Sequence, residues 1–307
     1  MDEQLSGMSR TKMRLKLKTA APIAVLALTV GGCTASEPAA DTGGPADATN
    51  TSPQRPATDA RVARAYVGVP DDPSTWRLPI EAYMPSHTQT RLVTGARDGL
   101  IDRCMSEAGY PAWKPAPDLP EVGGKSLTDW RYGIHDSELA AKRGYHPDAE
   151  EQRAYDDAMQ EGAVDESGAP PDVLRGCATQ ADGDVPAAQP AAIVQQVGGE
   201  AFSEAQRDRK VVAAFAQWSA CMKGKGFTYA APMDANDDPR FADPHVVTRL
   251  EIDTAKADTA CRERHHVNRT WFDAESTIQR AKIAGHLKEF DDAAEAVGLA
   301  VAKAAAV

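Results

Sequence analysis

Two segments of the chain follow one pattern: Ile101-Asp102-Arg103-Cys104-Met105-Ser106-Glu107-Ala108-Gly109-Tyr110 and Trp218-Ser219-Ala220-Cys221-Met222-Lys223-Gly224-Lys225-Gly226-Phe227. Both have the order apolar-x-x-Cys-Met-x-x-x-Gly-aromatic, which is typical of a helix C-terminus. Glycine takes the left-handed conformation just beyond a helix at little cost. The methionine then lies near the helix end and the aromatic residue just past the glycine, so a Schellman cap brings the two together. The pattern predicts two helices that each end beside a cysteine.

Apolar residues recur at helical spacing before each of these ends. Before the first end they fall on every fourth residue: Leu92, Ala96, Leu100, Cys104 and Ala108. The second helix is expected to open at the capping-box sequence Ser203 to Gln206. Its apolar residues, which we expect in the core, are Val211, Phe215, Trp218 and Met222.

Further helical patterns occupy much of the remaining sequence. Two shorter helices are expected at Asp136 to Gly144 and at Pro147 to Gly162. A long helical run is expected to begin with Asp243 as N-cap and Pro244 at the first helical position. Its apolar stripe continues toward the C-terminus at Trp271, Ala274, Ile278, Ala281, Gly285, Phe290, Ala294, Val297 and Val301.

The predicted fold is mainly α: an irregular, disulfide-stapled helical domain with Pro-rich loops and a long C-terminal helix. Only brief extended pieces are expected, near Val67 and Leu78, and irregular Pro-rich stretches at 111–128 and 163–190. Abundant alanine and few aromatic residues favour helices over a β-sandwich. The helical domain is expected over 61–307, with 61–187 and 188–307 as two candidate halves.

The chain has five cysteines, and four follow Cys33: Cys104, Cys177, Cys221 and Cys261. An even number in an exported protein indicates two disulfides. We favour pairing each capped helix end with the next cysteine along the chain, which gives Cys104–Cys177 and Cys221–Cys261. Zinc is the rival interpretation, but zinc sites usually have cysteine pairs separated by two to four residues, and these four cysteines are far apart in sequence.

The N-terminus has the order of a secretory signal, in which basic residues precede an apolar run. The basic leader consists of Arg10, Lys12, Arg14, Lys16 and Lys18, and Ala20 to Val30 is apolar but too short for a bilayer span. The run ends in Leu28-Thr29-Val30-Gly31-Gly32-Cys33, which resembles the lipobox of bacterial lipoproteins. We therefore expect residues 1–32 to be removed and Cys33 to carry lipid, including palmitate. The alternative is an ordinary cleaved signal with a chance cysteine, and translation from Met8 or Met13 would keep the basic leader.

Residues 33–60 are expected to be the lipidated cysteine and a disordered tether. Positions 34–60 contain no aromatic residue and no Leu, Ile, Val or Met. Such a segment cannot bury enough apolar surface to offset its chain entropy. As a coil, it would reach about 30 Å.

The charge balance argues against some partners. The chain has 34 basic and 45 acidic residues, a net charge of −11, and removing residues 1–33 with their five basic and two acidic residues lowers it to −14. Nucleic-acid binders carry basic patches, and adhesion to anionic lipid also needs basic residues. We expect no nucleic-acid partner, and membrane attachment only through covalent lipid.

Short motifs along the mature chain are specific as a combination. They are Leu78-Pro79-Ile80-Glu81-Ala82-Tyr83, Cys104-Met105-x-x-x-Gly109, Arg131-Tyr132-Gly133, Gly144-Tyr145-His146, Gly176-Cys177, Trp218-Ser219-Ala220-Cys221-Met222 and Cys261-Arg262. With them the chain resembles uncharacterised secreted lipoproteins of high-GC Gram-positive, actinobacterial type. The resemblance implies export and lipid attachment, and it supplies no catalytic residue.

A search for chemistry finds no complete catalytic or metal motif. G-x-S-x-G and H-E-x-x-H are missing from the sequence. Glu263 and His266 have the spacing of one half of a di-iron site, but the second half is missing, and we expect His265 to be a solvated neighbour. A partial calcium loop is formed by Asp234, Asn236 and Asp238, and it is more easily explained as a surface turn. A group of polar residues close in sequence could form a site, but loop capping explains them more easily: Arg131, His135, Asp136 and His146.

We therefore expect a non-catalytic binding or envelope-interaction module at the outer face of the cytoplasmic membrane, with no metal and no cofactor. Its expected partner is an envelope protein or a wall component. The rivals are a cell-envelope hydrolase, whose acid and base would come from carboxylates distant in sequence, and a ligand-capturing lipoprotein of a transporter. The latter class usually has α/β lobes.

Overall fold

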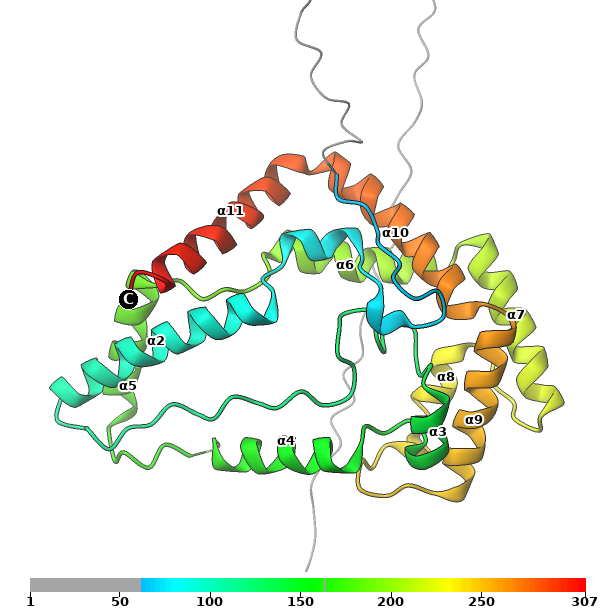
Figure 1. The fold of residues 1–307 in the computed structure, drawn as a ribbon, viewed down its shortest axis with the longest axis horizontal. Coiled ribbons are helices and arrows are strands. Elements are labelled where there is room, and N and C mark those ends of the chain that lie inside the picture. Colours follow the sequence, from blue (N-terminus) through cyan, green and yellow to red (C-terminus); the bar gives the residue numbers. More distant parts are fainter. Residues whose placement is uncertain (1–61, 163) are drawn as a thin grey trace, which may run out of the picture. The chain divides into compact units, whose positions relative to one another are not determined.

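The computed structural model describes residues 62–162 and 164–307, and these residues belong to one compact unit. The described part is mainly helical (Figure 1). Its only β pairing is an isolated antiparallel bridge between Tyr66 and Arg77, where the sequence predicts brief extended pieces. Among the described helices, none has the length and apolar character needed to cross a membrane.

The described helices follow one another in chain order. The α-helices are α2 (His87–Glu107), α3 (Ser137–Arg143), α4 (Ala149–Glu161), α5 (Pro171–Asp184), α6 (Ala192–Ala205), α7 (Arg209–Gly224), α8 (Pro232–Asn236), α9 (Arg249–Arg264), α10 (Val267–Gly285) and α11 (Leu287–Ala304). The 3₁₀ helices are η1 (Pro73–Thr75), η2 (Pro79–Tyr83) and η3 (Pro239–Phe241). Elements of the two candidate halves pack on each other, as α2 does on α11 and α3 on α9.

The two repeated segments end α2 and α7 as predicted. Gly109 has φ +94°, and the amide of Tyr110 donates to the carbonyl of Met105 at 2.9 Å. The same bond closes α7, where Phe227 donates to Met222 at 3.0 Å after Gly226 with φ +95°. Both are Schellman caps.

Two details of these helices differ from the prediction. The buried stripe of α2 contains Val93, Ile101 and Met105, whereas Leu92 is exposed, because α2 packs between α5 and α11. The predicted start of the second helix is also wrong. Ser203 lies inside α6, where its hydroxyl donates to the carbonyl of Gly199, and Asp208 caps α7 instead.

The disulfides join Cys104 to Cys177 and Cys221 to Cys261, which confirms the favoured pairing. The first connects the end of α2 to α5, and the second connects α7 to α9. The stretch 163–190, predicted as irregular, contains α5, because Pro171 at the first helical position starts a helix that buries Cys177 and Ala181. The stretch 111–128 is irregular as expected.

The predicted C-terminal helical run is divided into α9, α10 and α11. It starts later than expected: Thr248 caps α9 through a capping box with Glu251, and Asp243 instead accepts a hydrogen bond from the amide of His245 in the preceding turn. The run is interrupted at His266, which is left-handed, and at His286. The shorter predicted helices are α3 and α4.

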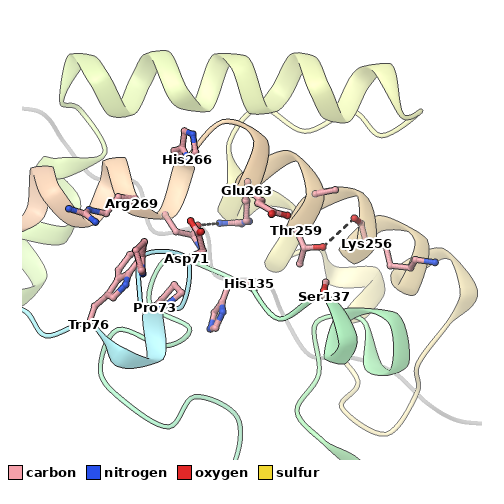
Figure 2. A pocket seen from close by; sticks show the side chains of 14 residues that line it. Asp71, Pro73, Trp76, His135, Ser137, Lys256, Thr259, Glu263, His266 and Arg269 are labelled. Atoms are coloured by element: carbon pink, nitrogen blue, oxygen red, sulfur yellow. Dashed lines mark hydrogen bonds between the residues drawn. The ribbon is translucent and has the colours of Figure 1, made fainter. Parts of the chain in front are cut away.

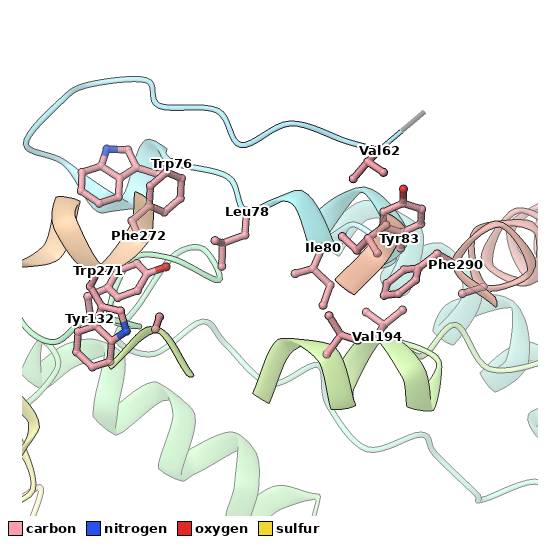
Figure 3. Close-up of a cluster of buried hydrophobic side chains, with 14 of the residues drawn as sticks. Val62, Trp76, Leu78, Ile80, Tyr83, Tyr132, Val194, Trp271, Phe272 and Phe290 are labelled. Carbon is pink, nitrogen blue, oxygen red and sulfur yellow. The ribbon is translucent and has the colours of Figure 1, made fainter. Parts of the chain in front are cut away.

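The largest hydrophobic cluster lies where α6, α7, α10 and α11 meet the N-terminal segment with η2 (Figure 3). Trp76, Tyr132, Trp271 and Phe272 are almost completely buried in it and form close ring contacts. This cluster fixes the segment around Trp76 against α10, and that contact forms one wall of the cavity described below.

Candidate functional site

Three fully buried carboxylates on α9 and α10 organise the loop that carries the sequence motifs. They are Glu251, Asp258 and Glu275, each with 0% exposure. A buried charge requires a partner and further hydrogen bonds. Each of these carboxylates obtains them from residues 131–146 or from α7 and α9.

Glu275 is bound by the first motif. It accepts from Nη2 of Arg131 at 2.6 Å, from the hydroxyl of Tyr132 at 2.8 Å and from Nε2 of Gln279 at 2.8 Å. Burial lowers the pKa of Arg131, but hydrogen bonding to Glu275 and its charge raise it overall. Burial and the neighbouring Glu275 raise the pKa of Tyr132 well above its ordinary value. Arg131 is therefore held in its charged form and Tyr132 in its neutral form.

Asp258 is bound by Nε of Arg262 at 2.6 Å, by the indole of Trp218 at 2.7 Å and by the hydroxyl of Tyr145 at 3.1 Å. The same arginine donates to the carbonyl of Tyr132. Gly133 has φ +94°, and a Cβ there would lie 2.6 Å from the guanidinium of Arg262. The chain therefore requires glycine at this position.

Glu251 binds the next motif. It accepts from the amide of Tyr145 at 2.9 Å, and Nε2 of His146 lies 3.4 Å from the same oxygen. Gly144, with φ +64°, lies directly against this carboxylate, so a side chain has no room. The glycines and polar residues of both motifs thus maintain the fold.

The polar group considered from sequence is separated by the structure. Arg131 and His146 face buried carboxylates, and Asp136 caps α3 through the amides of Glu138 and Leu139. Asp136 shares one cavity with His135, and His135 alone of the four also lines the cavity beside α9.

This cavity has a volume of about 350 Å³ and lies along α9 and the start of α10 (Figure 2). Its wall combines polar, charged and apolar side chains from three segments far apart in sequence. They are Pro70, Asp71, Pro73, Trp76, His135, Ser137, Lys256, Thr259, Ala260, Arg262, Glu263, His266, Asn268 and Arg269. Lys256, Thr259, Ala260 and Glu263 are spaced so that they share one face of α9.

His135 is paired with Asp129, whose Oδ1 lies 2.5 Å from Nε2. The pair is mostly buried, and His135 also lines a second cavity of about 620 Å³. Burial raises the pKa of Asp129, but the hydrogen bonds from His135 and the amide of Lys125 outweigh it, so the pKa lies below its ordinary value. An Asp–His pair at a cavity wall is suited to accept a proton.

His266 has φ +49° and ψ +38°, and it is the only described non-glycine residue with positive φ. This conformation costs roughly 1–2 kcal/mol. It allows α9 to turn directly into α10, and the side chain of His266 forms no hydrogen bond that caps α10. The start of α10 therefore faces the cavity with its first amides uncapped.

The metal patterns considered from sequence form no metal centre in the described residues. Across 62–162 and 164–307, no group of three or more His, Cys, Asp or Glu side chains is arranged to hold a metal. Glu263 and His266 both line the cavity, whereas His265 lines a different one beside Cys221. Members of the partial calcium loop are used locally, since Asp234 accepts from the amide of Ala231 and Asp238 pairs with Arg240.

The sequence alone did not single out most of the cavity residues. Asp71, Lys256, Asn268 and Arg269 are ordinary exposed-face or helix-start residues in sequence, and only the fold brings them together. The local signals were the spacing of Glu263 and His266, typical of half a di-iron site, and the polar group that contains His135. Cys33 lies outside the described residues.

The chain matches no protein-family model, no curated protein sequence and no solved structure at a significant level.

Proposed function

We propose that this chain is a lipid-anchored extracytoplasmic protein that binds a small ligand or wall component in the α9–α10 cavity and does not turn it over. The basic leader, apolar run and lipobox ending at Cys33 support the anchor. The two disulfides suit an oxidising compartment outside the cytoplasm. The tether at 34–60 would let the domain search about 30 Å from the membrane surface.

The observation that carries the binding role is the cavity itself. Its volume of about 350 Å³ lies at the lower end of the range for small-molecule sites. Its wall includes the exposed charged groups of Asp71, Lys256 and Glu263, none of which forms an ion pair with another described residue. Buried ion pairs behind it hold that wall in place.

The second candidate is a cell-envelope hydrolase, and the Asp129–His135 pair favours it. A histidine oriented by a carboxylate is a suitable general base for an attacking water. Ligand-capturing lipoproteins of transporters usually have α/β lobes. The described residues contain one isolated β-bridge as their only β pairing.

Photo-crosslinking in cells tests the binding role. A photoreactive amino acid is placed at Ala260, on the cavity wall, and for comparison at Ala294, which is exposed on α11 and lines no cavity described here. Conjugates specific to position 260 are expected. Equal labelling at both positions would exclude the cavity as the binding site. Hydrolysis of wall or peptide substrate that is lost in His135→Gln, with unchanged melting temperature, would favour the hydrolase.

A further inference from the structure

Three residues at the start of α10 line the cavity: His266, Asn268 and Arg269. The first amides of a helix have no acceptor within the helix and attract anions, and α10 is a 19-residue helix without a side-chain cap. Arg269, in its first turn, uses Nε to pair with Asp273 at 2.9 Å. Its terminal nitrogens form no hydrogen bond with a described residue, so they remain able to hold a carboxylate with two parallel bonds.

Asn268 adds a fixed amide donor to the cavity wall at this position. It is only 8% exposed and lines the cavity. Its Oδ1 accepts from Nη1 of Arg262 at 3.3 Å, which fixes the orientation of the amide group. Its Nδ2 donates to no described residue and is accessible to solvent, so it remains able to donate to a ligand.

The same cavity also contains carboxylates that lack cationic partners. Asp71 and Glu263 both line it and are exposed, and neither forms an ion pair with a described residue. Figure 2 shows them coming from different segments, the loop before η1 and α9. A simple anion would meet these carboxylates, and a simple cation would meet Arg269. A ligand with both charges satisfies both sets of groups.

From these contacts we infer that the cavity binds a small zwitterion of amino-acid or dipeptide size. Its carboxylate lies at the start of α10, on Arg269 and Asn268, and its ammonium group lies at Asp71 and Glu263. Lys256, nearer the start of α9 than Glu263, remains available to bind a polar group on the ligand side chain. This inference rests on the proposed function and names the ligand class for its cavity.

Calorimetric titration of the mature protein, purified in detergent, tests the inference with three probes at pH 7: alanyl-alanine, its N-acetyl form and its C-terminal amide. We expect binding of alanyl-alanine and at least tenfold weaker binding of each capped form. Arg269→Gln should weaken binding of the free dipeptide at least tenfold without further weakening binding of the C-terminal amide. Asp71→Asn should weaken binding of the free dipeptide at least tenfold without further weakening binding of the N-acetyl form.

Arg249→Gln is the matched control, because it removes an equivalent exposed pair with Asp253 on α9 and lies outside the cavity. It should bind alanyl-alanine as the unmodified protein does. Equal binding of free and capped dipeptides, or no binding of any of the three, would overturn the zwitterion assignment. Binding of an uncharged saccharide that is blocked by Ala260→Trp would also overturn it, while the proposed binding function would stand.

Discussion

Replacing Glu275 with leucine is expected to destabilise the protein by about 4 kcal/mol. Breaking a buried ion pair costs roughly 3–5 kcal/mol. The lower end applies here, because the side chain of Arg131 retains 18% exposure and keeps some hydration. The hydroxyl of Tyr132 is fully buried and loses its acceptor, which adds roughly 1 kcal/mol.

The double variant Arg131→Met with Glu275→Leu separates the ion pair from simple packing. It removes both charges and keeps apolar volume, so its loss should be at least about 2 kcal/mol smaller than the sum of the single losses. Urea unfolding followed by circular dichroism, with the disulfides intact, measures each free energy of unfolding. Glu275→Gln is a milder variant for use if Glu275→Leu does not fold.

The exposed pair Arg249–Asp253 provides the comparison, because its loss should cost at most about 0.5 kcal/mol and show little coupling. Additive losses at Arg131 and Glu275 would refute the reasoning. In that case the segment 131–146, which contains α3, would not depend on this buried pair for its position.

Three further predictions concern stability. Replacing Cys221 and Cys261 together by alanine should cost about 4 kcal/mol in the loop-entropy model, measured by urea unfolding, and a loss below about 1 kcal/mol would contradict it. Because the pKa of Asp129 is lowered by folding, its charge stabilises the fold above the unfolded pKa of about 3.9, and this contribution is lost as pH falls through the folded value. The difference in the free energy of unfolding between the unmodified protein and Asp129→Asn should thus narrow as pH falls below about pH 4; a difference that widens in acid would reverse the sign. Gly133→Ala should lower the free energy of unfolding by about 2 kcal/mol or more, because it adds a collision with a buried guanidinium to the left-handed strain. Gly109→Ala has the same φ but open space around it, so it should cost only about 1 kcal/mol. Equal losses at the two glycines would exclude the collision.

Local sequence patterns predicted the helix ends and the disulfides well. The Gly-aromatic ends of α2 and α7 depend only on neighbouring backbone geometry, so their caps follow from a few residues. The capping box at Ser203 failed for a comparable local reason: the hydroxyl bonds back to Gly199 inside α6, and Asp208 is the better cap. Such competition between neighbouring caps is decided by packing.

The cavity could not be predicted in the same way, because it depends on contacts between distant residues. Arg131 and Glu275 are 144 positions apart, and Tyr145 and Asp258 are 113 apart. These pairs hold the segment 131–146, which contains α3, against α9 and α10. In sequence, His135 was visible as a polar residue in a loop, but nothing showed that it would share a cavity with Asp71 and Arg269.

Lipid attachment at Cys33 is the claim on which the proposed location depends, and the location decides which ligands reach the cavity. Intact-mass analysis of the protein recovered from the membrane fraction tests it directly. The expected N-terminus is Cys33 carrying a lipid on its thiol, and the expected result for Cys33→Ser is an unlipidated chain. An unmodified Cys33 at the N-terminus of the unmodified protein, or a chain that retains residues 1–32, would contradict it.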